Sequence, residues 1–175
     1  MKKGVVISVI VISIIIIGII SFFTWIALMD DPSIPPDLPI ESKSGKITIT
    51  SNGCCMWVDD FKVIATSDYG DEIVIAEVPK ITVYDIFNFE MPVFDNVYSN
   101  ITISCTYYYG DYYEFNEVVF TVEDIGNNGL LLYIQEGDGA YFNAKSGNKQ
   151  VSYKLNHDTH NWDKLNTPTT LYKRG

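Results

Sequence analysis

The pattern of apolar and polar residues changes once along the chain. Residues 4–29 contain no charged side chain and are almost entirely apolar. An apolar stretch of about 18 or more residues predicts a membrane-spanning helix, because a helix satisfies its own backbone hydrogen bonds within lipid. From Gly45 onward apolar and polar residues alternate, as in Ile47, Thr48 and Ile49. This period of two predicts half-buried β-strands.

The apolar run is predicted to be a permanent anchor rather than a removable signal. A secretory signal has an apolar core of roughly 7 to 15 residues, followed by small residues at the cleavage site. This run is longer and ends in bulky residues such as Phe23 and Trp25. Because Lys2 and Lys3 precede it, the positive-inside rule predicts a cytoplasmic N-terminus, a single pass through the cell membrane, and residues 30–175 outside.

The same N-terminal residues resemble the start of a known family. Lys2, Lys3 and Gly4, followed directly by an uncharged helix, resemble the N-terminus of archaeal type IV pilins and archaellins. The resemblance implies cleavage after Gly4, a mature protein that begins at Val5, and apolar helices that pack in the core of a surface filament. It also implies a β-rich head, so anchor and filament subunit are alternative predictions for residues 4–29.

Proline content separates the anchor from the β-rich part of the chain. Four prolines fall within residues 30–44, which excludes a helix there and predicts an extended linker. The predicted organisation is therefore an anchor at residues 1–29, this linker, a β-sandwich domain at residues 45–156, and a polar tail at residues 157–175. We expect the tail to be poorly ordered, because it is polar and terminal.

Turn signals divide the domain into short strands. Pro79 is expected to interrupt one of them, and residues 87–99 are expected to form a loop. No amphipathic helix is predicted, so the expected fold class is an all-β ectodomain, an antiparallel β-sandwich that is Ig-like in the broad sense. The predicted strands are residues 45–50, 56–66, 72–78, 81–86, 100–109, 113–122, 130–135, 141–144 and 150–155.

One strand pairing can be predicted in detail. A three-residue loop at residues 110–112, with a β-bulge near Asn116 and Glu117, sets apolar residues opposite one another throughout. This register leaves Tyr108 and Tyr112 as the surface tyrosines, available for a sugar or a protein partner. The predicted pairs are Tyr109 with Tyr113, Tyr107 with Phe115, Cys105 with Val118, Ile103 with Phe120 and Ile101 with Val122.

The charge distribution excludes one class of partner. The apolar run carries no charge and only Lys2 and Lys3 precede it, so residues 30–175 hold all 22 acidic residues and the other ten of the twelve basic ones, a net charge of −12. Nucleic-acid binding needs a basic surface, and none is visible. We therefore predict contact with membrane lipid through residues 4–29 and no contact with nucleic acid.

Acidic residues in the predicted turns are candidate calcium ligands, because Ca²⁺ prefers oxygen ligands and can collect them from several loops. A strongly acidic surface also places carboxylates in turns simply because turns are exposed to water, so a solvated surface is the alternative. No other cofactor is predicted. The candidate ligands are Asp59, Asp60, Asp68, Asp71 and Asp138.

Three cysteines suggest one disulfide in an oxidising compartment. The predicted bridge joins Cys105 to either Cys54 or Cys55, and the alternative is three reduced thiols, mostly buried. Asn100, followed by Ile and Thr102, matches the acceptor pattern for N-glycosylation and is predicted to face outward.

The only two histidines, His157 and His160, lie in the predicted tail beside Asp158 and Asp163. Imidazole and carboxylate groups are zinc ligands, but solvated histidines are the alternative, because no further soft ligand has a typical spacing. Their position also leaves no conventional Ser-His-Asp site in the folded core.

These features together predict a membrane-anchored, extracytoplasmic β-sandwich with a structural or binding role and no enzymatic activity. Its expected partner is another protein at the cell surface or further copies of itself. The alternative is a pilin-like subunit processed after Gly4. A third possibility is a small cell-surface hydrolase with two carboxylates facing each other across a cleft.

Overall fold

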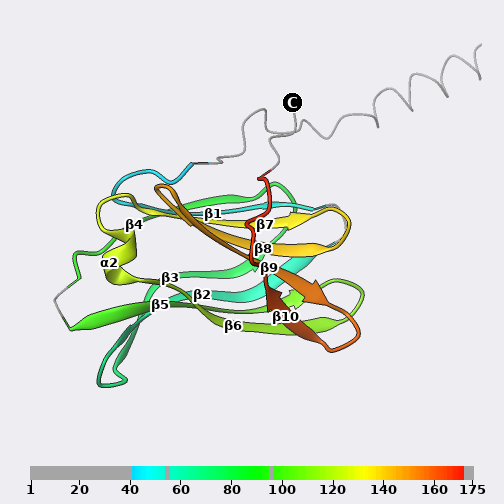
Figure 1. The fold of residues 1–175 in the computed structure, drawn as a ribbon, viewed down its shortest axis with the longest axis horizontal. Coiled ribbons are helices and arrows are strands. Elements are labelled where there is room, and N and C mark those ends of the chain that lie inside the picture. The colour runs from blue at the N-terminus through cyan, green and yellow to red at the C-terminus, as the bar shows by residue number, and fades with distance from the viewer. Residues whose placement is uncertain (1–40, 54–55, 95–96, 172–175) are drawn as a thin grey trace, which may run out of the picture. The chain divides into compact units, whose positions relative to one another are not determined.

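The structure, a computed structural model, describes residues 41–53, 56–94 and 97–171. Two β-sheets face each other in this part of the chain and form a β-sandwich-like fold, as Figure 1 shows. The predicted β-rich sandwich class is therefore confirmed for these residues.

The predicted anchor and its processing site at Gly4 lie outside the described residues, as does most of the proline-rich linker. Among the described segments, no helix has the length and apolar content needed to cross a membrane.

Ten strands and one short helix follow one another in the described residues. The helix, α2 (Val122–Ile125), comes between the sixth and seventh strands. The strands are β1 (Lys46–Asn52), β2 (Trp57–Ser67), β3 (Glu72–Ile81), β4 (Ile86–Glu90), β5 (Tyr98–Tyr108), β6 (Tyr112–Thr121), β7 (Leu130–Glu136), β8 (Ala140–Ser146), β9 (Lys149–Asn156) and β10 (Asn161–Lys164).

The two sheets differ in size and in strand direction. The larger sheet has six strands in the order β10-β9-β8-β7-β1-β4, and the smaller has four in the order β3-β2-β5-β6. All neighbours are antiparallel except β1 and β7, which run parallel.

Alternating side chains from both sheets fill the space between them. In β5 the inward residues Ile101, Ile103 and Cys105 are almost fully buried, while the residues between them are partly exposed. Phe115 of the smaller sheet meets Phe142 of the larger one with ring centroids 4.4 Å apart. Each such buried ring stabilises the fold by roughly 2 to 3 kcal/mol, so aromatic contacts hold the sheets together.

The predicted register between β5 and β6 is wrong by two residues. Tyr107 lies opposite Tyr113, not Phe115, and the turn consists of residues 109–111. The bulge is also misplaced, because the extra residue is Val119. A slip of two residues keeps the side chains before the bulge on their predicted faces, so the apolar pattern could not distinguish the two registers there. The misplaced bulge changes one face, because Val118 was predicted to point inward and is 51% exposed on the outer face.

The smaller sheet continues through a proline that was expected to break it. Pro79 lies within β3, which is an edge strand of the sheet. An edge strand has one side without a partner, so a residue that lacks an amide hydrogen is tolerated there.

Three elements were not predicted. β4 lies partly in the segment expected to be a loop, and its Phe87 and Phe89 pack against the core. β10 lies in the segment expected to be a poorly ordered tail and pairs with β9. Val122 was expected to end a strand, but it begins α2, because Thr121 and Asp124 form a reciprocal capping box.

Candidate binding site at the tip of the sandwich

The first described residues, 41–45, lead into β1 at one end of the sandwich, which we call the base. The backbone amide of Gly147, in the β8–β9 turn, donates to Ser42 Oγ at 2.9 Å. Gly129 has φ +73°, and a Cβ atom there would lie 1.9 Å from the carbonyl oxygen of Lys43. Only glycine permits this approach, so contacts with the backbone of Gly147 and Gly129 fix residues 42 and 43 at the base.

The β5–β6, β7–β8 and β9–β10 turns gather at the opposite end, to the right in Figure 1. Strands of 7 to 11 residues connect the two ends, which at about 3.3 Å per residue separates them by roughly 23 to 36 Å. We call the tip the six residues that meet where the β5–β6 and β9–β10 turns touch. They are Tyr109, Asp111, Tyr112, Tyr113, His157 and His160.

Both imidazoles of the tip contact the ring of Tyr113. Its hydroxyl lies 3.0 Å from Nδ1 of His157, and that imidazole meets the ring edge-on at a centroid distance of 5.5 Å. The ring of His160 lies 5.3 Å from Tyr113 at an interplanar angle of 30°. His160 Nε2 is 3.8 Å from Asp111 Oδ2, so the loop after β9 is held against the turn of the other sheet.

A stack of aromatic rings adjoins the tip on the smaller sheet. The rings of Trp57 and Tyr108 are parallel within 13°, with centroids 3.8 Å apart. Lys80 Nζ lies 4.8 Å from the Trp57 ring centroid, and Tyr112 meets Tyr108 edge-on at 5.2 Å. Tyr108 and Lys80 both contact the Trp57 ring, which leaves it poorly placed to stack on a sugar. The exposed ring and hydroxyl of Tyr112 suit a protein partner better.

The predicted division of the tyrosines is confirmed for four of the five. Tyr107 and Tyr113 are buried, Tyr112 is 60% exposed, and Tyr108 is partly exposed. Tyr109 was expected in a strand and instead belongs to the turn, where it is partly buried and packs on His157.

The acidic neighbours of the histidines make other contacts in the described structure. The Asn156 side chain donates a hydrogen bond to the Asp163 carboxylate and accepts one from the backbone amide of Asp158. Within residues 41–53, 56–94 and 97–171, no three or more His, Cys, Asp or Glu side chains converge as metal ligands would.

The candidate calcium ligands lie in three separate places. Asp59, which accepts from Trp57 Nε1 and pairs with Lys80, lies near the start of β2 beside Asp60. Asp68 and Asp71 share the β2–β3 turn at the far end of that strand.

Asp138 belongs to the β7–β8 turn of the other sheet, where it accepts hydrogen bonds from Tyr141 and Lys154. These two bonds hold the pKa of the Asp138 carboxyl below its usual range. The structure therefore brings Asp59 close to Asp60 and Asp68 close to Asp71, but it does not bring all five together.

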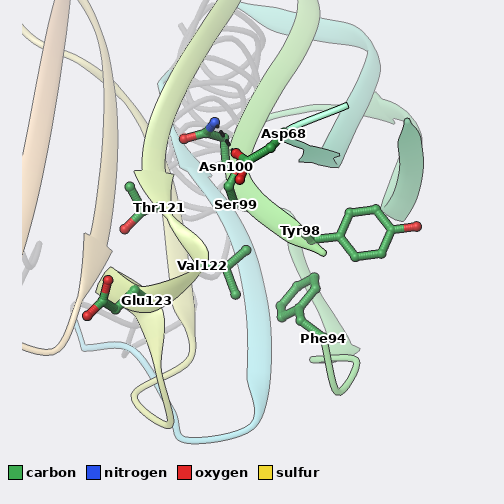
Figure 2. Close-up of a pocket in the computed structure, with 8 residues that line it drawn as sticks. All are labelled: Asp68, Phe94, Tyr98, Ser99, Asn100, Thr121, Val122 and Glu123. Carbon is green, nitrogen blue, oxygen red and sulfur yellow. Dashed lines mark hydrogen bonds between the residues drawn. The ribbon is translucent and has the colours of Figure 1, made fainter. Parts of the chain in front are cut away.

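A pocket of about 550 Å³ opens near the base, beside α2. Figure 2 shows Asn100 and Asp68 on one side of it and Phe94 on another. Asn100 Nδ2 donates to Ser99 Oγ at 3.1 Å, and the side chain is partly exposed on the outer face of β5. The outward orientation expected of a glycosylation acceptor is present, and the modification itself stays a prediction.

Cys105 forms no disulfide within the described residues; its thiol lies in the core and is 4% exposed. Burial, and to a smaller extent the charge of Glu114, raises the pKa of this thiol well above its usual value. Its proposed partners Cys54 and Cys55 lie outside the described residues.

Sequence reasoning missed the tip as a unit. The tyrosines and the histidines were each noticed, but they are separated by more than 40 positions and belong to different sheets. The pairing of Tyr113 with His157 depends on how the two sheets face each other, which no local pattern encodes.

The fold and the tip define a β-sandwich-like domain with an aromatic and histidine cluster at one end. No family model, curated protein or solved structure matches the sequence.

Proposed function

We propose that this protein is a membrane-attached, extracytoplasmic and non-enzymatic binding protein, whose tip contacts a protein partner at the cell surface. In this proposal the domain binds as Ig-like sandwiches do, through turns from both sheets that lie together at one end. The observation that carries the proposal is the position of the tip, at the end of the sandwich opposite the base.

The base is where a tether would be joined to the domain. An anchor at residues 4–29 continues through residues 30–40 to Glu41, and Ser42 is held at the base. The strands then separate that attachment point from the tip. The net charge of −12 supports the same arrangement, because an acidic domain is repelled by anionic lipid.

The composition of the tip suits protein recognition. Tyrosine offers a large contact area with a polar hydroxyl, and it is enriched in natural binding loops. The exposed side chains of Tyr112, Asp111 and His160 present an aromatic ring, a carboxylate and an imidazole together. Contacts with Tyr113 already hold the two imidazoles, which reduces the side-chain entropy lost on binding.

Fractionation of native cells tests the attachment. The full chain is expected in the membrane fraction after an alkaline carbonate wash, whereas a variant without residues 4–29 is expected in the soluble fraction. Recovery of the full chain in the soluble fraction would overturn the proposal.

The pilin-like alternative rests on Lys2, Lys3 and Gly4, and the mature N-terminus distinguishes it. Sequencing of the protein from native cells yields Met1 for a fixed anchor. It yields Val5 for a processed filament subunit.

A further inference from the structure

The outer faces of the two sheets differ in exposure. On the six-stranded sheet, outward residues such as Thr50, Tyr133 and Asn143 are fully buried. The segment after β10 covers part of that face, since Thr169 Oγ1 donates to Asn143 Oδ1 at 2.6 Å and its amide donates to Ser152 Oγ. On the four-stranded sheet, Val74 and Val118 are 52% and 51% exposed.

The register of the four-stranded sheet arranges its outward side chains in rows across β3, β2, β5 and β6. Two rows carry charges and the next row is largely apolar. In that strand order, the first charged row is Lys80, Asp59, Thr106 and Glu114, the second is Glu77, Lys62, Ser104 and Asn116, and the apolar row is Val74, Ile64, Thr102 and Val118.

We propose that this face binds a second copy of the protein, face to face. The proposal does not depend on the tip, and it requires that Asn100, at the next outward position of β5 after Thr102, carry no glycan. The exposed valines supply the driving force. Large apolar side chains on a sheet face lose contact with water when another sheet packs on them, which is favourable. The occupant is inferred from how the charges of the face are distributed.

A two-fold axis parallel to the strands, between β2 and β5, places β3 of one copy over β6 of the other. In this arrangement Val74 lies opposite Val118 of the second copy, and Lys80 lies opposite Glu114 of the second copy. The symmetry generates each contact twice. In the rows defined above, no two like charges are opposed.

Other positions of the axis oppose like charges. An axis along β2 places Asp59 opposite Asp59 and Lys62 opposite Lys62 of the second copy. An axis across the strands, between the two charged rows, places Lys80 opposite Glu77 and Asp59 opposite Lys62 of the second copy. It also brings together two copies of Asp60, which is exposed and occupies the β2 bulge with φ +52°. Opposed like charges are unfavourable in a sheet-to-sheet contact, so the axis between β2 and β5 is the one that fits.

Pairing through the edge of the sheet is less suitable than pairing through its face. β3 is the edge strand on one side, and it contains Pro79 and a bulge at Ile75. Both features disrupt the regular row of hydrogen-bonding groups that a further strand needs.

The face is small for a permanent dimer. Strands about 4.8 Å apart and rows about 7 Å apart give a contact on the order of 500 Å² per copy, against about 800 Å² in a standard interface. The expected association is weak and reversible. Attachment of both copies to one membrane would raise their effective concentration.

Two variants of the full chain, each with one added cysteine and the native cysteines retained, test the geometry. Within one copy, Val74 and Val118 lie on strands three positions apart, about 14 Å, which is too far for a disulfide. A mixture of Val74→Cys and Val118→Cys in detergent is therefore expected to form a mixed disulfide dimer on mild oxidation. Each variant alone is expected to give no more dimer than the wild type.

No mixed dimer would overturn the proposal, and so would an equal yield from one variant alone. Charge reversal provides a second measurement by sedimentation of the full chain. Lys80→Glu and Glu114→Lys are each expected to weaken dimerisation at least tenfold, and the double variant is expected to recover most of it. Lys164→Glu, an exposed change of the same charge on β10, is the matched control, and an equal loss there would also contradict the proposal.

These results are independent of the proposed function. A monomeric protein in the carbonate-washed membrane fraction refutes only the dimer. A dimer recovered in the soluble fraction refutes only the membrane attachment.

Discussion

The two ends of the sandwich are built from different interactions. At the base the backbone is fixed by tight contacts, such as Gly129 against the carbonyl of Lys43, and by the capping box of Thr121. At the tip, side chains make the contacts, and Tyr113 lies between two imidazoles. A substitution at a tight backbone contact disturbs the fold, whereas an exposed side chain can be replaced at little cost in stability. We therefore expect stability to depend on the base and binding to depend on the tip.

The largest expected effect is that of Gly129→Ala at the base. The new Cβ atom would meet the Lys43 and Lys46 carbonyl oxygens at 1.9 and 2.6 Å, with φ at +73°. We expect the free energy of unfolding to fall by about 3 kcal/mol, measured by denaturant titration. Gly110→Ala, in the β5–β6 turn that carries part of the tip, is the matched control, because φ is +77° there but no atom lies within 4 Å. We expect it to cost about 1 kcal/mol, and equal losses at the two positions would contradict the comparison.

Buried tyrosines beneath the tip predict a loss of stability at alkaline pH. Burial raises the pKa of Tyr153 to about 12 and raises that of Tyr107 further. The unfolded chain loses these protons near pH 10, so the folded state holds them more tightly and is stabilised below that pH. The free energy of unfolding is therefore expected to fall as pH rises from 10 to 12.

Tyr153→Phe tests this cause. The variant has no proton to lose, so its stability should fall less steeply than that of the wild type over the same pH range. Tyr112→Phe, at a side chain that is 60% exposed, is the control for loss of a hydroxyl. Identical slopes for Tyr153→Phe and the wild type would reject the explanation.

A smaller effect is expected at the helix beside the base. Thr121→Ala removes the side chain that accepts the Asp124 amide at 3.0 Å. We expect a loss of about 1 kcal/mol, whereas Thr121→Ser keeps the hydroxyl and should retain most of the stability. Thermal unfolding of both variants measures the difference. If serine is as damaging as alanine, the hydroxyl is not what stabilises α2.

The smallest effect is expected at the tip. Tyr112→Ser removes a ring that is 60% exposed and meets Tyr108 only edge-on. We expect a change within about 0.5 kcal/mol, as for other surface substitutions. A loss comparable to that of Gly129→Ala would show that the tip supports the fold and is not a separable binding surface.

Much of the fold could be predicted because alternation of apolar and polar residues is a local signal. It located most strands and the inward face of β5 correctly. It failed where the signal is short or symmetric: β4 and β10 have only five and four residues. A shift of two residues between β5 and β6 left the faces unchanged except at Val118, beside the misplaced bulge, so the pattern could not exclude it.

The candidate site was less predictable, since it depends on contacts between distant segments. The polar residues around His157 suggested a free tail, yet Trp162 of β10 packs against the core and brings that loop to Tyr113. The buried outer face of the larger sheet was equally invisible, because nothing local marks Thr50 or Asn143 as covered.

Labelling of intact cells tests the central claim most directly. A full chain with Tyr112→Cys places a thiol at the tip, and the wild type supplies the background from the native cysteines. We predict that a membrane-impermeant maleimide labels this variant on intact native cells well above the wild type, with little increase after lysis. Labelling above background only after lysis would place the tip inside the cell and contradict the account.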